Sequence, residues 1–253
     1  PIRSKAVVTI HRTAGSNARV AERRAMGYRA VLFDYDGVIA TPAPHDVLRA
    51  GTRAGLQATG VTDPPADVID ALVSGVTIDR LRTVADRVDI APDHLWFHRD
   101  VHSSRAQRAA RRAGWVTPYP DIDVLDVLAA TDIRLGVVSS NQRQTVRSGL
   151  VAVGLADRFE TVEARPPTLT SLTRKKPAPD YLDRAMATLT VDPSETLFVG
   201  DRSDDVAAAH AAGADALFVR RDHRTEYDLD RDPEFERPDL TDLPAIVGSM
   251  ETG

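Results

Sequence analysis

Short apolar runs recur along the chain and predict the strands of a buried sheet. They lie at residues 31–33, 133–138, 159–162, 196–199 and 216–219. Most of their residues are Val, Ile, Leu and Phe, which pack well on a pleated surface. Segments with helical apolar spacing lie between the later runs, at residues 142–153, 180–189 and 204–212. Strands that alternate with helices predict βαβ units, and therefore an α/β fold with a doubly wound parallel sheet.

Between residues 41 and 118 the apolar spacing is helical, and no strand pattern interrupts it. The predicted helices lie at 45–59, 63–73, 77–88 and 93–113, separated by Gly or Pro. Asp63 is placed to cap the second of them, because the prolines that follow it suit a first helical turn. A block of this length is the size of a small domain. We therefore expect a helical insert between the first and second strands.

The two ends of the chain are predicted to add little to this fold. Residues 1–27 are rich in Arg and Ala and lack periodicity, and Met26 stands just before the first strand. We expect them to be a disordered extension, with Met26 as the natural start. A helix at 121–130 is predicted to precede the second strand. The charged segment 220–237 is predicted to be loop, and 243–250 a last short helix.

The composition is that of an ordinary folded protein, and it narrows the classes of function. Of 253 residues, 42% are hydrophobic and 27% charged, with 37 acidic and 32 basic residues giving a net charge of -5. Such a chain lacks the basic field typical of nucleic-acid binding. No apolar run reaches the roughly 18 residues that span a bilayer. The absence of Cys excludes disulfides and agrees with a cytoplasmic location. We expect neither a nucleic-acid nor a membrane partner.

The first predicted strand ends in two carboxylates, Asp34 and Asp36, followed at once by Gly37. Open α/β sheets bind ligands in the crevice beyond the carboxyl ends of their strands, so acids at this position indicate an active site. Gly37 would let the chain turn sharply where a Cβ would clash. An ordinary turn is the alternative interpretation, because Asp and Gly are common turn formers.

Three later segments also carry reactive side chains close to the ends of predicted elements. They are Ser139-Ser140 after the second strand, Lys176 before Pro177-Ala178-Pro179, and Gly200-Asp201 with Asp205 after the fourth strand. Together with Asp34-Tyr35-Asp36-Gly37, and in this order, they resemble the four motifs of the haloacid dehalogenase superfamily. The resemblance spans residues 31–205 and implies a Rossmann-like core with a helical cap, similar to phosphoglycolate phosphatases.

This resemblance implies a role for each acid. Asp34 would attack phosphorus to form an aspartyl-phosphate, and Asp36 would protonate the leaving group and then activate water. Mg²⁺ would be held by the Asp34 carboxylate, the Asp36 carbonyl and Asp201, with Asp205 holding the metal shell, because Mg²⁺ prefers oxygen ligands. In the namesake dehalogenases the residue two positions after the nucleophile is not an acid. Asp36 therefore favours phosphoryl chemistry.

The phosphoryl group of the substrate would be bound by Ser139, Ser140 and Lys176. The Ser139 hydroxyl and the next backbone N–H would bind a phosphoryl oxygen, with Ser140 as the alternative if the register differs by one. Capping of the following helix by one of these serines or by Asn141 is the non-catalytic alternative. Lys176 would bridge Asp34 and the phosphoryl group. For Lys175 a solvated loop position is the favoured interpretation.

One predicted helix carries other candidates. His94, His98 and His102 are spaced to share one helix face, but a zinc site would need a further ligand, and a surface face of the insert is the preferred interpretation. The same helix carries Arg105, Arg108, Arg111 and Arg112. Most of these are expected to be solvated, although one or more would suit an anionic substrate tail. Trp96 and Trp115 are expected in the core.

The resemblance also implies a division of labour between two domains. The core would comprise residues 28–40 and 119–253, and a cap at 41–118 would exclude water and select the substrate. We expect a Mg-dependent phosphatase of a small phosphorylated metabolite, as a monomer or homodimer. A phosphomutase of the β-phosphoglucomutase type and a non-catalytic binding protein are the alternatives. The concentrated acids argue against the last, because like charges destabilise a protein that has no use for them.

Overall fold

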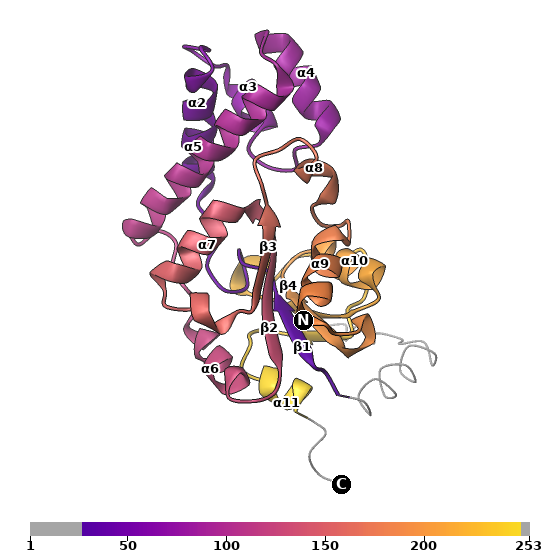
Figure 1. Ribbon diagram of the computed structural model, residues 1–253. Coiled ribbons are helices and arrows are strands. Elements are labelled where there is room, and N and C mark those ends of the chain that lie inside the picture. The colour runs from indigo at the N-terminus through magenta and orange to yellow at the C-terminus, as the bar shows by residue number, and fades with distance from the viewer. Residues whose placement is uncertain (1–26, 249–253) are drawn as a thin grey trace, which may run out of the picture.

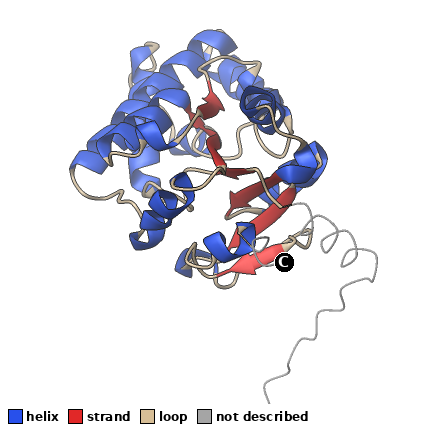
Figure 2. Cartoon of the chain, turned by 60° about the horizontal axis from the view of Figure 1, so that its bottom comes forward, coloured by secondary structure: helices blue, strands red, loops and turns tan. Residues whose placement is uncertain are grey.

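A parallel sheet of six strands forms the centre of the computed structural model, which describes residues 27–248. The strand order is β3-β2-β1-β4-β5-β6, and helices lie on both faces (Figures 1 and 2). The strands are β1 (Ala30–Phe33), β2 (Arg134–Gln142), β3 (Thr161–Arg165), β4 (Thr196–Gly200), β5 (Asp215–Val219) and β6 (Phe235–Arg237). The predicted doubly wound α/β fold is confirmed. The expectations for residues 1–26 and for the end of the last helix lie outside the described residues.

The central strand β1 is buried on both sides because alternate side chains enter different apolar clusters. Val31 and Phe33 pack with helices α6, α7 and α11 on one face. Ala30 and Leu32 pack with α9 and α10 on the other. These helices are α6 (Val124–Ala129), α7 (Arg143–Ala152), α9 (Asp180–Leu189), α10 (Ser203–Ala212) and α11 (Leu243–Val247). A strand covered on both faces reads as a continuous apolar run, which explains the sequence pattern.

The connections around β1 determine where a ligand site can form. β1 pairs with β2 on one side and with β4 on the other, in parallel register. The chain thus leaves β1 toward β2 and β3, and later returns to β4 on the opposite side. In open α/β sheets, ligands bind beyond the carboxyl ends of the strands at such a reversal. The segments that follow β1 and β4 therefore meet at the favoured position.

Four helices between β1 and β2 form a separate layer beyond the carboxyl ends of the strands (Figure 1). They are α2 (His45–Ala58), α3 (Ala66–Ala71), α4 (Ile78–Val88) and α5 (Pro92–Arg112). Helices α2 and α5 approach closely, since a Cβ added to Gly55 would lie 2.6 Å from Arg99 Cα. Leu56, Ile69, Leu81 and Trp96 belong to an apolar cluster distinct from the two of the sheet. This cluster joins the four helices and also includes Leu172, from outside the insert. The domain bounds at 41 and 118 stay a prediction.

Several element boundaries differ from those predicted. β2 continues to Gln142 through a register shift against β3, instead of ending before Ser139. The helix α3 begins at Ala66 with Pro65 as its N-cap, so Asp63 does not cap it. The tail predicted as loop contains β6, where Phe235 is buried against β5 among charged neighbours. Charge density concealed this edge strand, because only one side chain of its three is buried.

Short elements complete the described chain. They are α8 (Ser171–Arg174), which was not predicted, and the 3-10 turns at Pro120–Asp123, Ala156–Arg158, Pro193–Glu195 and Asp222–Arg224. The first of these turns replaces the beginning of the helix predicted from residue 121. Trp96 is buried as expected, but Trp115 is 65% exposed. Trp115 lies beyond the end of α5, after Gly114, and therefore outside the packing of the insert.

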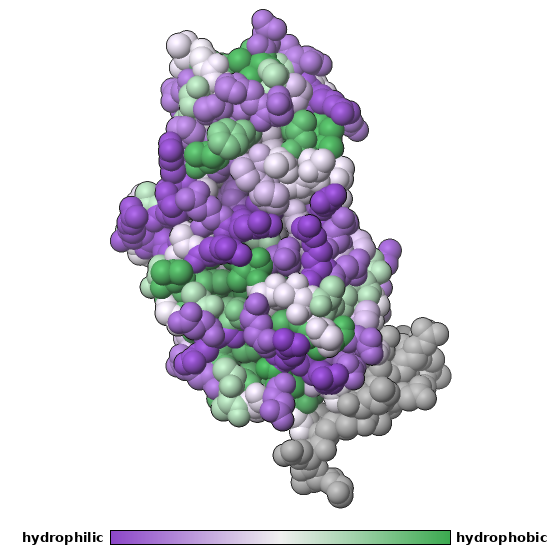
Figure 3. All heavy atoms as spheres, in the orientation of Figure 1, coloured by the Kyte–Doolittle hydropathy of each residue, from purple (hydrophilic) through white to green (hydrophobic). Residues whose placement is uncertain are grey.

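The helices and the surface of the described residues were compared with the features of a membrane-spanning segment and of an exposed apolar patch. None of the helices between residues 27 and 248 is long and apolar enough to cross a membrane. The face shown in Figure 3 is largely hydrophilic, with separate apolar patches. Exposed large apolar side chains are Phe97, Trp115, Val127 and Val151.

Candidate active site

Three buried carboxylates converge beyond the carboxyl ends of β1 and β4. Asp34 follows β1, and Asp201 follows β4, with Asp205 in the first turn of α10. One carboxylate oxygen from each lies within 4.8 Å of the others. Gly37 makes room for this approach, because its φ is +85° and an added Cβ would lie 2.3 Å from Asp201 Oδ2. The structure therefore brings together the first and fourth predicted motifs.

Lys176 is the cation that pairs with two of these acids. Its buried ammonium group lies 2.9 Å from Asp34 Oδ2 and 2.6 Å from Asp205 Oδ1, and it donates to the carbonyl of Val138 at 3.3 Å. The other oxygen of Asp205 accepts hydrogen bonds from the backbone N–H groups of Asp201 and Arg202, each at 3.0 Å. Asp205 is thus held in place by the turn that begins α10.

Burial raises the pKa values of Asp34 and Asp205 more than the nearby positive charge lowers them. Burial raises the pKa of Asp34 to about 7, and the neighbouring carboxylates add to this shift, although Lys176 opposes it. Burial likewise raises the pKa of Asp205, again against the effect of Lys176. Asp34 and Asp205 share one lysine, so this pair of acids carries more negative charge than Lys176 neutralises. A cation would relieve this imbalance.

Asp201 differs because His223 and Arg224 hold it. Its Oδ2 lies 2.9 Å from His223 Nε2 and 2.9 Å from Arg224 Nε. Burial alone would raise its pKa, but the hydrogen bond from His223 and the charge of Arg224 outweigh burial and leave the pKa below its ordinary value. Its Oδ1 is buried and accepts no hydrogen bond from residues 27–248. That oxygen is available to a ligand.

Asp36 is half-buried and is held by an amide from the end of β2. Asn141 Nδ2 donates to Asp36 Oδ2 at 2.7 Å and to Gln107 Oε1, on α5, at 3.0 Å. Burial raises the pKa of Asp36 to about 6, while the hydrogen bond from Asn141 lowers it and the charge of Asp201 raises it. Asp36 can therefore exist in both protonation states near neutral pH, as a proton carrier requires.

Ser139 and Ser140 lie beside this cluster. With Asp34, Asp36 and Lys176 they line one cavity of about 280 Å³. Ser139 Oγ accepts a hydrogen bond from the N–H of Asn141 at 3.2 Å, whereas Ser140 Oγ is buried with no hydrogen-bond partner in the described chain. The helix-capping alternative is wrong, because α7 has Gln142 as its N-cap and no side chain caps it. Phosphate binding by either serine stays a prediction.

The donor atoms of the cluster fit a hard divalent cation. Asp34, Asp201 and Asp205 offer carboxylate oxygens within a small volume, and Asp201 Oδ1 lacks a partner. Mg²⁺ prefers such oxygen ligands and is commonly bound by one or two carboxylates with water and substrate phosphate. Within residues 27–248 this is the one group of three acids, histidines or cysteines with such spacing. His94, His98 and His102 do share a face of α5, with neighbouring rings 4.5 and 6.3 Å apart.

Sequence reasoning missed several residues of the site. His223 and Arg224 lie in the short turn after β5, next to β4 in the sheet. The rule that found Asp34 and Asp201, polar residues directly after a buried strand, would not have found them, because β5 ends at Val219 and Arg220 and Arg221 follow it first. Asn141 was considered only as a helix cap. Lys175, predicted to be solvated, is half-buried and lines the cavity.

Comparison with known proteins agrees with this geometry. Residues 31–219 match the sequence profile described as haloacid dehalogenase-like hydrolase. The chain belongs to this family. A phosphoglycolate phosphatase of Neisseria meningitidis is 30% identical over 229 residues, which cover 88% of this chain and 94% of that protein. The pyrophosphatase PpaX of Oceanobacillus iheyensis is 30% identical over 158 residues, covering 62% of this chain and 72% of its own.

Solved structures of haloacid dehalogenase-like proteins share the fold. CbbY from Rhodobacter sphaeroides in complex with phosphate superposes with a TM-score of 0.67 at 19% identity, covering 87% of this chain and 99% of that one. A 2-haloacid dehalogenase from Pseudomonas syringae has a TM-score of 0.59 at 22% identity, covering 88% and 99%. At these identities the similarity shows the fold alone. The predicted resemblance, and the expectation of a hydrolase, are confirmed.

Proposed function

We propose that this haloacid dehalogenase-like hydrolase is a Mg-dependent phosphatase that hydrolyses a small phosphomonoester through an aspartyl-phosphate on Asp34. The observation that carries the proposal is the placement of Lys176 between Asp34 and Asp205 in a buried acidic cluster. A carboxylate can attack a doubly charged phosphoryl group only where cations neutralise the site. The similarity to a phosphoglycolate phosphatase over 88% of the chain supports the same activity.

Each acid would then have its own role. Asp34 Oδ attacks phosphorus, and Lys176 neutralises the phosphoryl oxygens as the ester bond breaks. Asp36, held by Asn141, gives its proton to the departing alkoxide oxygen and takes one from the water that cleaves the aspartyl-phosphate. Its raised pKa, about 6, suits a group that must donate and accept in turn. The Ser139 and Ser140 hydroxyls would bind the phosphoryl oxygens that Lys176 leaves free.

The residues that would hold Mg²⁺ are Asp34, Asp201 and the backbone carbonyl of Asp36, with Asp205 fixed behind them. When bound, the ion would supply positive charge to the phosphoryl oxygens and to Asp34. The protein's own part is to keep the carboxylates together: Gly37 allows their approach, and His223 with Arg224 orients Asp201. The helical insert, residues 41–118, would act as the cap that covers the cavity and excludes water.

A phosphate-release assay over a panel of esters tests the proposal. We suggest the esters 2-phosphoglycolate, p-nitrophenyl phosphate and β-glucose 1-phosphate, with the anhydride pyrophosphate as a further substrate, each with Mg²⁺ or with EDTA. We expect release from at least one ester with Mg²⁺, loss in EDTA, and a loss of at least about a thousandfold in Asp34→Asn. Asp132→Asn, an exposed acid in the turn before β2, is the matched control and should keep full activity.

Three other outcomes would argue against the proposal. Release that survives both EDTA and Asp34→Asn would refute the mechanism. Transfer of phosphate to a second position of glucose 1-phosphate, without free phosphate, would identify a phosphomutase. If every ester failed in the presence of Mg²⁺, a non-catalytic binding protein would be the better interpretation.

A further inference from the structure

Lys175 is a half-buried cation in the cavity wall, although its sequence context predicted a solvated loop position. It directly precedes Lys176 and lines the same cavity as Asp34 and Ser139. Its ammonium group donates to the backbone carbonyl of Val76, in the helical insert, at 2.9 Å. No carboxylate of residues 27–248 forms an ion pair with it. An ammonium group has three N–H donors, so donors remain for which residues 27–248 supply no acceptor.

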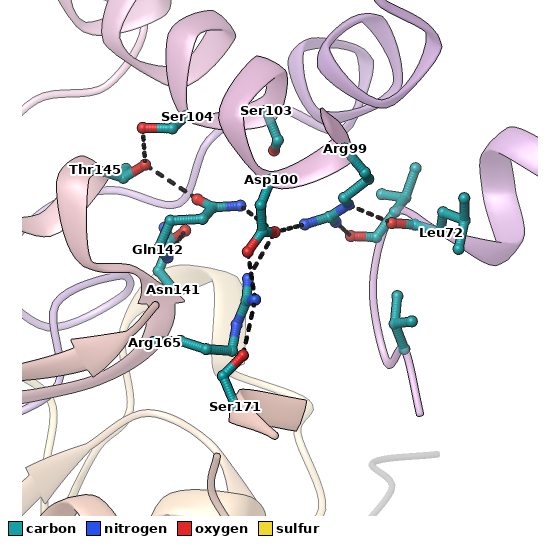
Figure 4. A network of polar contacts seen from close by, with 12 residues as sticks. Leu72, Arg99, Asp100, Ser103, Ser104, Asn141, Gln142, Thr145, Arg165 and Ser171 are labelled. Carbon is teal, nitrogen blue, oxygen red and sulfur yellow. Dashed lines mark hydrogen bonds and ion pairs between the residues drawn. The ribbon is translucent and has the colours of Figure 1, made fainter. Parts of the chain in front are cut away.

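The wall beside Lys175 is itself cationic. Figure 4 shows the buried carboxylate of Asp100 between the guanidinium groups of Arg99 and Arg165. Both arginines line the cavity, and both stack against Trp96, with their central carbons 5.0 and 4.7 Å from the ring centroid. One carboxylate cannot neutralise two guanidinium groups. With Lys175, this wall carries three cations and one anion.

Hydrogen bonds from Arg99 and Lys175 hold a loop of the helical insert against this wall. Arg99 donates to the carbonyls of Leu72 and Val73 at 2.8 and 2.6 Å, and Lys175 holds Val76. The loop between α3 and α4 is thus tied at both ends above Lys175. Arg165 donates to the carbonyl of Ser140 at 3.2 Å, which joins the cationic wall to the serines predicted to bind phosphate.

The two parts of the cavity therefore differ in charge. At one part, Lys176 lies between Asp34 and Asp205, with Asp201 close to both acids. At the other part, Arg99, Arg165 and Lys175 outnumber Asp100. Arg202 and Asp204, which also line the cavity, carry opposite charges. Burial lowers the pKa of Lys175, and the nearby Arg165 lowers it further, partly offset by Asp204. An anion beside Lys175 would compensate this excess of positive charge.

We propose that Lys175 binds a second anionic group of the substrate, so that the protein selects phosphomonoesters with an acidic tail over esters with a neutral one. Arg99 and Arg165 are positioning residues that keep this wall cationic and hold the loop of the insert above it. The proposal rests on the proposed phosphatase function and adds the class of substrate. Both carboxylate and phosphate tails fit this chemistry.

A matched pair of esters tests the selectivity directly. 2-Phosphoglycolate has a carboxylate where 2-hydroxyethyl phosphate has a neutral hydroxymethyl group, and pyrophosphate tests a phosphate tail. We expect Lys175→Met to raise the KM for 2-phosphoglycolate about tenfold or more, with kcat within about threefold. Its KM for 2-hydroxyethyl phosphate should change less than about twofold. Lys175→Arg should recover most of the affinity for the acidic ester.

Arg174→Gln is the control variant. Arg174 is the neighbour of Lys175 in sequence, but its side chain is 50% exposed, and it does not line the cavity. The variant removes the same formal charge and should leave both KM values unchanged. Equal effects of Lys175→Met on the acidic and the neutral ester would overturn the proposal, because they would indicate a structural role. If Arg174→Gln raised the KM for 2-phosphoglycolate as much as Lys175→Met does, the effect would be long-range electrostatic attraction. That result would also overturn the proposal.

Calorimetry separates this inference from the proposed function. In Asp34→Asn with Mg²⁺, we expect 2-phosphoglycolate to bind about tenfold or more tightly than 2-hydroxyethyl phosphate, and Lys175→Met to abolish the difference. This result would support the anion site even if the wild-type protein hydrolysed neither ester. Equal binding of the two esters by Asp34→Asn would overturn the inference, even if hydrolysis established the phosphatase.

Discussion

The ammonium group of Lys176 lies 2.9 Å from Oδ2 of Asp34, and both side chains are buried. These residues are separated by 142 positions in sequence and by the whole helical insert. The sheet brings them together because β1, which precedes Asp34, lies between β2 and β4. Lys176 reaches the acid across the end of β2, where it also contacts the Val138 carbonyl. The pair determines both the charge and the expected pH behaviour of the site.

Asp34→Asn should stabilise the metal-free protein at alkaline pH. The pKa of Asp34 is raised by burial to about 7, from an ordinary value of 3.8. The folded state therefore keeps a proton that the unfolded chain has lost, and stability falls as pH rises from about 4 to 7. Above pH 7 the ionised carboxylate of Asp34 lowers the stability of the folded protein by the full free-energy cost of its burial. The neutral amide of the Asn variant does not have this cost. We expect thermal unfolding at pH 8 in EDTA to shift upward by several degrees.

The same experiment has a pH control. At pH 4 the difference between Asp34→Asn and the wild-type protein should be small, because both forms of residue 34 are then neutral in the folded state. Asp132→Asn should show no shift at either pH. A loss of stability at pH 8 would contradict the prediction and would mean that the Lys176 ion pair outweighs the burial of Asp34.

Mg²⁺ should stabilise the folded protein, and more strongly at pH 8 than at pH 5. Protons compete with the metal for Asp34, whose pKa is raised to about 7, so binding weakens as pH falls through 7. Differential scanning fluorimetry over a Mg²⁺ titration measures the effect. Asp201→Asn should reduce the shift severalfold, because it replaces a carboxylate whose Oδ1 is available to a ligand. An undiminished shift in this variant would place the cation elsewhere.

Asn141→Ala should move the alkaline limb of the pH profile of kcat/KM to higher pH. The Asn141 amide stabilises ionised Asp36 through a 2.7 Å hydrogen bond, and this bond lowers the pKa of Asp36. Without it the carboxyl group should stay protonated to higher pH, so the acid needed for the leaving group persists. Gln57→Ala, an exposed amide on α2, is the control and should leave the profile unchanged. A profile unmoved by Asn141→Ala would argue against Asp36 as the proton donor.

Asp100→Ala should lower the free energy of unfolding by about 3–5 kcal/mol, because it leaves Arg99 and Arg165 buried without their shared carboxylate. Urea denaturation measures the change. Asp79→Ala is the matched control, since Asp79 pairs with Arg82 at 3.7 Å on the surface and should cost less than about 1 kcal/mol. Similar losses in the two variants would show that Arg99 and Arg165 are held by their carbonyl contacts instead.

Sequence alone determined the class of fold and the acids of the site. Apolar runs such as 31–33 are buried on both faces, so they can be recognised as strands from the sequence pattern alone. Asp34, Asp201 and Lys176 were found because they follow or precede strongly patterned elements. The edge strand β6 was missed because only Phe235 in it is buried. Boundaries at Ser139 and Asp63 were misplaced, since a bulged strand and a Pro-led helix start leave no periodic signal.

Only the tertiary structure determined the exposure and the contacts of the lysine and arginine side chains. Arg174, Lys175 and Lys176 are three consecutive bases in sequence, yet Arg174 is half exposed, Lys175 lines the cavity and Lys176 is buried between two acids. Their environments depend on strands and on an insert far away in the chain, and local pattern carries no information about such contacts. For the same reason the Arg99–Asp100–Arg165 network could not be read from the sequence. Sequence thus located the acids that converge in the candidate site, and only the folded chain revealed the cationic wall of the same cavity.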